Sequence, residues 1–539
     1  MASRRDELNA YTFARKRMVG AFLQPGGGGS DEDAPRPVRA VLPSIVVAAV
    51  VVAGFGMWGV IKPTAPKGWD DGKSIIQGKD STTRYVVLVD PKTNEKYLHQ
   101  VLNMASARLV LPAGAKVVPV VDSALDAYKN HGATIGIPYA PDRLPTSDDA
   151  SQAKLWSVCD RPGVGGQQAT INQSVFVAAD SEKKMLQRPD LVLGSGQWLF
   201  VQGPQDGAQD INNKDLPASE YLIDQAGMKH ALGDNSTDPI DRHAMEAALF
   251  GSDATREQVS KEWLATLGDG APIKFPTMPS GNNIGAHSTV NITQQSERKV
   301  GRLLSFQDKT YYVVGAQNLY QISAFQAELM RNSRALKDAY PSGTTPKFAE
   351  LSPNDYASLK DSVVTKMMDD DPKDMPKEKP AEHAVNDGKG ARTVLCSTFE
   401  GWDSDKNVKR SVWAHTEYPA QVSSGSASAH VSPGHGLLFR AVDGKGGGDS
   451  SGSNFLITET GLRYSVPSNN DGPNAKGAPP ATSAPADPQG GAAQQQGNEA
   501  QARLGYDKVQ PTLVPRAWSD LVPAGPVLNT SAALQAQNA

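Results

Sequence analysis

Cysteine is scarce in this chain: its 539 residues contain only two, Cys159 and Cys396. Two cysteines allow at most one disulfide, which would form in an oxidising compartment; the alternative is a pair of unpaired, buried thiols. A strong excess of charge is also absent, because the formal net charge is −4. This balance gives no indication of a nucleic-acid partner.

Common catalytic motifs are absent as well. The sequence has no H-E-x-x-H zinc motif and no G-x-S-x-G nucleophile elbow. Gly72-Lys73-Ser74 resembles the end of a P-loop, but Lys67 stands where that motif needs glycine, and no strand is expected before it. A nucleotide site at Lys73 and Ser74 is therefore the weaker interpretation. Finding no motif lowers the odds of catalysis without excluding it, because distant residues can assemble a site.

Three histidines are modestly clustered: His415, His430 and His435. Zinc sites have tighter ligand spacing, so these residues are better explained as surface or loop histidines. We expect no catalytic residue, no metal and no cofactor.

Charge is missing from one long stretch, Ala40–Ile61. As a helix with a rise of about 1.5 Å per residue, it would cover roughly 33 Å, enough to cross the hydrocarbon core of a bilayer. Pro43 fits its first turn, and Trp58 suits an interface. A cleaved signal peptide fits less well, because the region before the run is too long. The stretch therefore predicts a single membrane span.

The orientation follows from the basic residues on the two sides of the run. Those before it are Arg4, Arg5, Arg15, Lys16, Arg17, Arg36 and Arg39. The other flank has fewer, and Asp70 and Asp71 offset them. The positive-inside rule then predicts a cytoplasmic N-terminus and an extracytoplasmic remainder, which includes both cysteines.

Residues 3–24 predict an amphipathic cytoplasmic helix, with Ser3 and Asp6 as a capping box. Its candidate docking residues are Leu8, Tyr11, Phe13, Arg15, Lys16, Arg17, Met18 and Phe22. Such a helix can bind a partner or lie on anionic lipid, or its charges can serve only to set topology. A glycine-rich joint then completes the N-terminal region, residues 1–39.

The extracytoplasmic part contains a repeated pattern of an aromatic residue, aliphatic residues and a turn. Three copies align without a gap from Tyr221, Tyr312 and Phe455, and a fourth with a longer turn starts at Tyr85. Each predicts a hairpin, with a residue that tolerates positive φ at its tip: Gly227, Asn318 or Gly461. The irregular spacing favours four small modules around a centre over a solenoid; chance similarity of hairpins is the alternative.

Helical segments are expected between the hairpins, at Met104–Leu109, Ser123–Asn130, Asp241–Phe250 and Ser323–Arg334. Two segments have the composition of unstructured chain, Met368–Gly390 and Ser468–Ala502. After the second, residues 503–539 become apolar again. We expect that tail to pack back on the extracytoplasmic domain.

The order of several short motifs along the whole chain resembles that of EccB, a membrane component of the type VII (ESX) secretion system. The motifs are Tyr11–Arg17, Leu98–Leu109, Gly136–Pro141, Trp156–Cys159, Tyr311–Val314, Thr460–Tyr464 and Leu521–Leu528. The signature residues of the second are Leu98, His99, Asn103, Ser106, Ala107, Arg108 and Leu109. Gln100 and Tyr139 depart from the pattern, where relatives usually have proline and glycine.

The resemblance implies a single-pass membrane protein whose extracytoplasmic α+β part, residues 62–467, is elongated, with a central β-containing core and four peripheral repeat modules. The repeats would lie near 85–109, 221–250, 312–334 and 455–466, and the core near 155–200 and 392–440. A Cys159–Cys396 disulfide would lie in that core. The spacer at residues 468–502, which composition predicts to be disordered, departs from the family by its greater length.

The implied function is that of a structural subunit, working with EccC, EccD, EccE and the mycosin protease, with self-association of the extracytoplasmic domains. Two alternatives remain at this point: a nucleotide hydrolase, since some relatives are labelled ATPases, and a cell-wall-binding anchor.

Overall fold

The computed structural model describes most of the chain. The described residues are 4–23, 38–61, 65–162, 171–205, 219–234, 236–279, 281–364, 375–378, 381, 383–388, 391–422, 427–443, 452–467 and 499–537. They fall into two compact units. Unit 1 comprises Met1–Trp69, Gln77–Thr82 and Val118–Lys129, and unit 2 comprises Asp70–Ile76, Thr83–Val117 and Asn130–Ala539.

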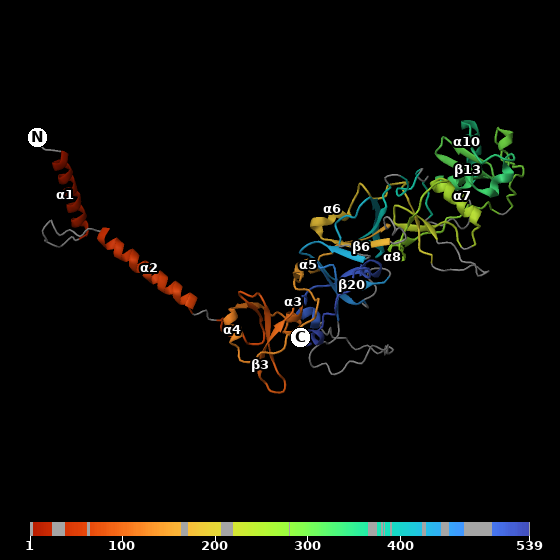
Figure 1. Ribbon diagram of the computed structural model, residues 1–539. Coiled ribbons are helices and arrows are strands. Elements are labelled where there is room, and N and C mark those ends of the chain that lie inside the picture. Colours follow the sequence, from red (N-terminus) through yellow and green to blue (C-terminus); the bar gives the residue numbers. More distant parts are fainter. Residues whose placement is uncertain are drawn as a thin grey trace. The chain divides into compact units, whose positions relative to one another are not determined.

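Unit 1 begins with two helices, α1 (Arg4–Leu23) and α2 (Val38–Ile61) (Figure 1). The helix α2 covers the predicted span and contains Pro43. Among the helices of the described residues, none combines the length and the apolar character that a membrane crossing requires. The span therefore stays a prediction, and Ser3 of the expected capping box lies outside the described residues.

The rest of unit 1 is a small folded region built around Asp122. Its carboxylate accepts hydrogen bonds from the backbone N–H groups of Asp80 and Ser81 and from the Ser81 hydroxyl. Trp69 and Tyr128 pack edge to face with ring centroids 5.4 Å apart. This region contains α4 (Asp122–Asp126), shorter than the helix expected over Ser123–Asn130.

A central sheet organises unit 2. Its strand order is β18-β17-β5-β6-β19, in which β5 pairs antiparallel with β6 and β17, and β19 pairs parallel with β6. The strands are β5 (Leu155–Pro162), β6 (Ile171–Ala178), β17 (Val394–Trp402), β18 (Val408–His415) and β19 (Ala427–Val431). The helices α5 (Ser147–Ser151), η2 (Asp180–Glu182) and α6 (Lys183–Leu186) flank it in sequence.

Modules 2 (residues 199–273) and 3 (residues 285–364) share one topology. Three antiparallel strands are followed by a helix, a short strand parallel to the first, another helix and a short strand parallel to the third. The orders are β10-β7-β8-β9-β11 and β15-β12-β13-β14-β16. These short parallel strands, the return strands, span only two or three residues. That is too few to be recognised from hydrophobic alternation.

The elements of module 2 are β7 (Leu199–Gln202), β8 (Glu220–Ile223), β9 (Met228–Ala231), α7 (Pro239–Phe250), β10 (Glu257–Gln258), α8 (Lys261–Ala265) and β11 (Gly268–Asp269). Those of module 3 are η3 (Gln295–Glu297), β12 (Leu303–Phe306), β13 (Thr310–Val314), β14 (Leu319–Ile322), α9 (Ala324–Arg331), η4 (Arg334–Ala339), β15 (Phe348–Glu350), α10 (Pro353–Leu359), η5 (Lys360–Ser362) and β16 (Val363–Val364). A capping box of Ser323 and Gln326 starts α9.

Module 4 (residues 436–467 and 499–537) repeats this topology across a gap in the described residues. Its order is β22-β21-β20-β23, and Ala524 bridges to Arg463 parallel to the third strand. Its elements are β20 (Gly436–Val442), β21 (Asn454–Thr458), β22 (Arg463–Val466), α11 (Glu499–Arg503), β23 (Thr512–Pro515), α12 (Arg516–Ser519) and α13 (Thr530–Ala533). The spacer expected over Ser468–Ala502 thus ends too late, because α11 begins at Glu499.

Module 1 (residues 83–117 and 130–137) shows the corresponding part of the same plan. The hairpin β2 (Arg84–Val89) and β3 (Lys96–Val101) precedes α3 (Met104–Val110). Parallel bridges then join β3 to His131 and Ile135. The strands β1 (Ile75–Gly78) and β4 (Val117–Val120) each have residues in both units.

All four aligned sequence segments form hairpins in the structure. Gly227 and Gly461 have the expected positive φ at the turn, at 72° and 73°. The expectation for Asn318 is wrong, because that residue keeps a negative φ. Its turn closes instead through a hydrogen bond of 2.8 Å from the Gly315 N–H to the Asn318 carbonyl.

The modules pack in two pairs. One buried core joins module 2 to module 3 through Phe200, Leu222, Leu249, Phe325 and Leu329. Another joins module 1 to module 4 through Leu109, Ile137, Leu456, Tyr464 and Leu504. Figure 1 shows the second pairing directly, since the C-terminus lies beside α3.

The segment 375–388 corrects the expectation that Met368–Gly390 is unstructured. Its described residues run along modules 2 and 3. The Lys377 carbonyl accepts from the Phe325 N–H, and Val385 donates to the Trp198 carbonyl. Asn386 is fully buried and exchanges hydrogen bonds of 2.9 and 2.7 Å with the backbone of Phe200. Backbone pairing holds this segment, and composition carries no signal of it.

Candidate functional site

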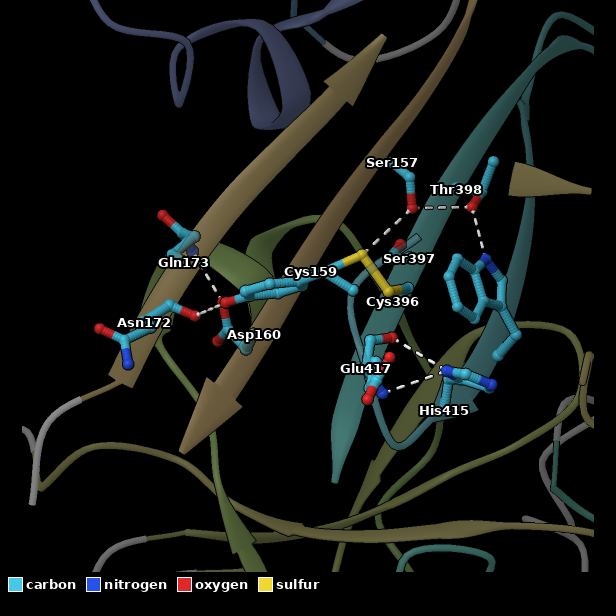
Figure 2. The surroundings of a disulfide bond; sticks show 12 residues. Ser157, Cys159, Asp160, Asn172, Gln173, Cys396, Ser397, Thr398, His415 and Glu417 are labelled. Carbon is cyan, nitrogen blue, oxygen red and sulfur yellow. Dashed lines mark hydrogen bonds between the residues drawn. A yellow bond between two sulfur atoms is a disulfide. The ribbon is translucent and has the colours of Figure 1, made fainter. Parts of the chain in front are cut away.

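The two cysteines form the predicted disulfide. Cys159 on β5 stands directly opposite Cys396 on β17, with Cα atoms 4.1 Å apart, and both are fully buried (Figure 2). The bond closes a loop across 237 positions of sequence. Modules 2 and 3 lie entirely inside this loop.

A short polar network runs beside the disulfide. The Trp413 indole donates to the Thr398 hydroxyl at 3.0 Å, and Thr398 donates to Ser157, also at 3.0 Å. Ser157 lies 3.7 Å from the Cys159 sulfur (Figure 2). Each of these hydroxyls thus has a partner inside the sheet, as buried polar groups require.

Asp160, next to the disulfide, fixes module 2 to the central sheet. Its carboxylate accepts from the Ser260 N–H and hydroxyl at 2.7 and 2.6 Å, and from Gln173 at 3.1 Å (Figure 2 shows the Gln173 bond). Ser260 is the N-cap of α8. Burial raises the pKa of Asp160 to about 6, because the hydrogen bonds only partly offset the cost of desolvating the charge.

The signature segment Leu98–Leu109 forms the end of β3 and most of α3. Asn103 caps α3 by accepting from the Ser106 N–H, and its own amide donates to the Ile137 carbonyl. The Ser106 hydroxyl accepts from the Ile137 N–H at 2.8 Å. Leu98 and Ala107 are buried. Asn103 and Ser106 therefore hold the turn that follows Gly136.

Arg108 and Leu109 connect this signature to the end of the chain. The Arg108 guanidinium donates to the Leu504 carbonyl at 2.8 Å, and Arg503 donates to the Leu109 carbonyl at 2.7 Å. Each arginine thus donates to a carbonyl at the C-terminal end of the helix that carries the other arginine. A Cβ on Gly505 would come within 2.5 Å of the Arg108 guanidinium, so glycine leaves the room that this contact needs.

A third signature residue, His99, packs on Gly132, which follows the bridge residue His131. Its ring lies where a Cβ of Gly132 would stand, and its Nδ1 is 2.8 Å from the Ala133 carbonyl. His230 in module 2 packs in the same way on Gly270 and faces the Ala271 carbonyl. This recurrence shows that His99 has a structural role shared between modules.

Sequence reasoning missed the residues of the tail that complete this site: Arg503, Tyr506, Thr530 and Gln537. Thr530 donates to the Leu109 carbonyl, and Gln537 donates to the Gly136 carbonyl. Their partners lie hundreds of positions away in sequence. No local pattern marks such contacts.

The residues considered for nucleotide binding have a different setting from a P-loop. Lys73 and Ser74 precede the strand β1, whereas the motif follows a strand and opens a helix. The Lys73 N–H donates to the Asp71 carboxylate at 2.8 Å, which is a local turn contact. Their role in binding a nucleotide stays a prediction that the local geometry does not favour.

The candidate docking helix presents its side chains to solvent. All described residues of α1 are exposed or nearly so, including Leu8, Tyr11, Met18 and Phe22. Phe13 is exposed too, and lies at a different angle around the helix from these four. Arg15, Lys16 and Arg17 lie between Phe13 and Met18.

The histidines considered for a metal site are separate in the structure. His415 faces the Glu417 backbone, His430 approaches Glu182, and His435 binds Asp149 at 2.6 Å. Over the described residues, no group of three or more metal-ligating side chains converges. The signature residues and the disulfide thus lie in defined sites. The residues of α1, Lys73 and the three histidines do not come together in a site.

A family model described as "Type VII secretion system ESX-1, transport TM domain B" matches residues 1–539. The chain belongs to the EccB family. This finding confirms the resemblance drawn from the short motifs and the assignment to type VII secretion. The family description names a transmembrane domain, which agrees with a membrane location.

Curated EccB proteins are similar over most of the chain. The "ESX-1 secretion system ATPase EccB1" of Mycobacterium tuberculosis H37Rv is 22% identical over 477 residues, 86% of each chain. The "ESX-3 secretion system ATPase EccB3" of the same organism is 25% identical over 520 residues, covering 93% of this chain and 83% of its own.

Solved EccB structures share the fold. An EccB3 dimer from the ESX-3 core complex has a TM-score of 0.55 and 20% identity, with coverage of 86% of this chain and 100% of that one. A chain of an intact ESX-5 inner membrane complex has a TM-score of 0.54 and 18% identity, with coverage of 100% and 96%. These likenesses confirm a mixed α+β fold of the EccB type.

Proposed function

We propose that this chain is a structural subunit of a type VII secretion membrane complex, tying a cytoplasmic docking helix to an extracytoplasmic scaffold. The match of the family model over the whole chain carries this proposal. The similar structures support it, since they come from an ESX-5 inner membrane complex and an EccB3 dimer. The elongated outline expected from the resemblance stays a prediction.

Within that role, Ala40–Ile61 crosses the membrane once with the N-terminus in the cytoplasm. The support is the absence of charge from the run and the excess of basic residues before it. The disulfide agrees with an oxidising compartment for unit 2. Cysteines introduced at Ser30 and Ser81 test the orientation with a membrane-impermeant maleimide. Labelling of Ser81→Cys but not Ser30→Cys in intact cells is expected, and the reverse would overturn the topology.

The partners of this subunit are EccC-, EccD- and EccE-like proteins and a mycosin protease, and unit 2 self-associates. Purification of the full-length chain in mild detergent tests this directly. Recovery with an EccC-like ATPase and the other membrane subunits is expected. Recovery of the chain alone would contradict the assignment to a secretion complex.

The helix α1 makes the cytoplasmic contact, because its apolar side chains lack a cover in the structure. The variant Tyr11→Ser/Phe22→Ser removes two of them and should lower the recovery of the other subunits about tenfold. Asn9→Ser on the same helix is the matched control and should leave recovery unchanged. Equal recovery with both variants would exclude α1 as the docking element.

A nucleotide hydrolase is the second candidate, because the names of the EccB1 and EccB3 relatives contain the word ATPase. Lys73→Ala in the purified full chain tests it. Hydrolysis that is absent, or equal in wild type and variant, counts against a site at Lys73. A loss confined to Lys73→Ala would establish it.

A further inference from the structure

Modules 2 and 4 pack on the central sheet through an equivalent surface. A stretch of nine residues aligns between them without a gap, Val259–Leu267 in module 2 and Val514–Val522 in module 4. Its first, fifth and ninth residues are buried in the core that both modules share with the central sheet. The fifth is tryptophan in both, Trp263 and Trp518, at most 1% exposed. We call the surface that carries this stretch the docking face of a module.

Module 3 has the same stretch but does not use it in this way. The stretch is Leu351–Leu359, which starts directly after the return strand β15 and continues through α10. Asp355 stands at its fifth position, where the other two modules have tryptophan. Among the described residues, none from module 3 belongs to the core that modules 2 and 4 share with the central sheet. A different part of the chain covers its docking face.

The cover is the segment 288–293, which we call the strap. Every second residue of the strap is buried, with Ser288, Val290 and Ile292 at 1%, 4% and 2% exposed. Val290 and Ile292 share one core with both apolar ends of the stretch described above. This alternation is that of an extended chain that lies flat on an apolar surface.

The strap lies on the side of the sheet that module 2 turns toward the central sheet. Tyr312 of module 3 aligns with Tyr221 of module 2, and the strand residues opposite them are Leu304 and Val201. Leu304 belongs to the core that contains the strap, whereas Val201 belongs to the core that contains the central sheet. The strap therefore takes the place of the central sheet on module 3.

Polar contacts hold the two ends of the strap. At the first end, the Ser288 hydroxyl donates to the Gly315 carbonyl at 2.6 Å. At the other end, the N–H and hydroxyl of Thr293 donate to the Asp355 carboxylate at 3.2 and 2.6 Å. A carboxylate packed against an apolar sheet would lack such donors and would be costly to bury. Asp355 in place of tryptophan thus suits closure by the strap and not docking on the central sheet.

We propose that the strap is an autoinhibitory lid, which opens from the docking face of module 3 while the rest of the module stays folded. The strap forms none of the strands of the module's sheet, so its opening leaves the ladder of β12, β13 and β14 intact. When closed, it withholds from other sheets a face of the kind that modules 2 and 4 use. This inference does not depend on the assignment to a secretion complex.

A charge beneath the strap tests the lid. Val290→Asp places a carboxylate against the apolar face and should release the strap. Gln294→Asp adds the same charge at an exposed position directly after the strap and is the matched control. Hydrogen exchange of the full-length chain in mild detergent, followed by mass spectrometry, compares the strap with β12–β14 and with β7. In each background, the rate at which a maleimide labels Leu351→Cys reports exposure of the face.

In Val290→Asp, exchange in the strap should rise at least about tenfold, while β12–β14 and β7 keep wild-type protection. Labelling of Leu351→Cys should become faster than in the Gln294→Asp background. Asp355→Ala removes the tie at Thr293 and should give a smaller rise in the same segment. The proposal is overturned if β12–β14 lose protection together with the strap in both variants, because the strap would then be an inseparable part of the core. Unchanged exchange in the strap of Val290→Asp, or equal labelling in the two backgrounds, would overturn it as well.

Discussion

The two pairs of modules are built from the same repeat but closed in different ways. Modules 2 and 3 are consecutive in sequence, lie inside the loop of the disulfide and are crossed by the segment 375–388. Modules 1 and 4 join opposite ends of unit 2 and are closed by the C-terminal segment, residues 499–537. One pair is closed by chain that lies between module 3 and the central strand β17 in sequence, whereas the other is closed by chain that follows β22 across a gap in the described residues.

Modules 2 and 4, one from each pair, nevertheless contact the central sheet alike. The second helix of module 2 buries Trp263, and the second helix of module 4 buries Trp518, in one core with the sheet. The Trp518 indole donates to the Ser397 carbonyl at 3.1 Å, whereas Ser260 anchors α8 through Asp160. The two pairs thus differ in the segments that close them. The pair of modules 1 and 4 depends on contacts between residues that are far apart in sequence.

Removal of the disulfide should have the largest effect. Cys159→Ala/Cys396→Ala frees the loop that contains modules 2 and 3. The chain-entropy estimate for a loop across 237 positions is about 5 kcal/mol of stability. Guanidinium unfolding of the full chain, followed by tryptophan fluorescence, measures it. Reduced wild type should match the variant, and an unchanged midpoint would show that the β5–β17 pairing suffices alone.

Protonation of Asp160 should have the second-largest effect on stability, because it changes only the hydrogen bonds that fix module 2 to the central sheet. Its folded pKa of about 6 exceeds the ordinary 3.8, so the folded state binds this proton more tightly. Its contribution to stability is full below pH 4 and is lost as pH rises through 6. The loss is about 3 kcal/mol at most.

The variant Asp160→Asn keeps an acceptor for Ser260 and should flatten the pH dependence of stability between pH 4 and 7. Urea unfolding at several pH values is the measurement. Asp234→Asn is a contrasting control, since hydrogen bonds from Lys274 and Ser236 lower the pKa of Asp234 below its ordinary value. A wild-type slope in the Asp160→Asn variant would assign the pH dependence to other groups.

Asn386→Ala should weaken the pair of modules 2 and 3 by about 2 kcal/mol, since it leaves a buried N–H and C=O of Phe200 without partners. Hydrogen exchange at β7 and β8 reads out the change. Lys377→Ala on the same segment is the matched control, because its side chain is exposed and its backbone carbonyl keeps the bond from Phe325. Equal protection in wild type and Asn386→Ala would show that the segment 375–388 does not brace this pair.

Arg503→Ala should loosen the other pair by about 1.5 kcal/mol, because the Leu109 carbonyl keeps only its bond from Thr530. Protection from exchange should fall in α3 and β23 but not in β7. Arg108→Ala should have a similar effect. The double variant should destabilise the pair by about the sum of the two single effects, because the two arginines donate to different carbonyls. A loss of protection spread over modules 2 and 3 would contradict the separation of the pairs.

The sequence predicted those parts of the fold whose signals are local. Hairpins at Tyr221 and Phe455 follow from strand residues next to a glycine turn, and the helix expected over Ser323–Arg334 forms as α9. Counting two cysteines left one disulfide or two buried thiols open, and the resemblance implied the disulfide that the structure contains. The two-residue return strands were missed because hydrogen bonds to a preformed sheet, rather than their own side chains, define them.

The same limit applies to the candidate site. The signature Leu98–Leu109 was recognisable as a motif, but its partners Arg503 and Gln537 carry no local mark. The segment 375–388 was misjudged because charged residues and prolines predict exposed chain, whereas Asn386 lies fully buried against Phe200. Contacts between remote residues depend on the assembled fold, and a single sequence does not record them.

Tyr139→Gly should give the smallest change in stability. It tests the turn after Gly136, which Asn103 and Ser106 of the α3 region hold. Tyr139 adopts φ of 62°, which an aromatic residue rarely takes, while its side chain is 87% exposed. Glycine would relieve strain of about 1 kcal/mol, partly offset by the greater freedom of glycine in the unfolded chain. The net gain should be below about 1 kcal/mol and confined to modules 1 and 4. Tyr139→Ala, which keeps the Cβ and hence the strain, should show no gain; a clear loss with Tyr139→Gly would mean that the exposed ring itself contributes to folding.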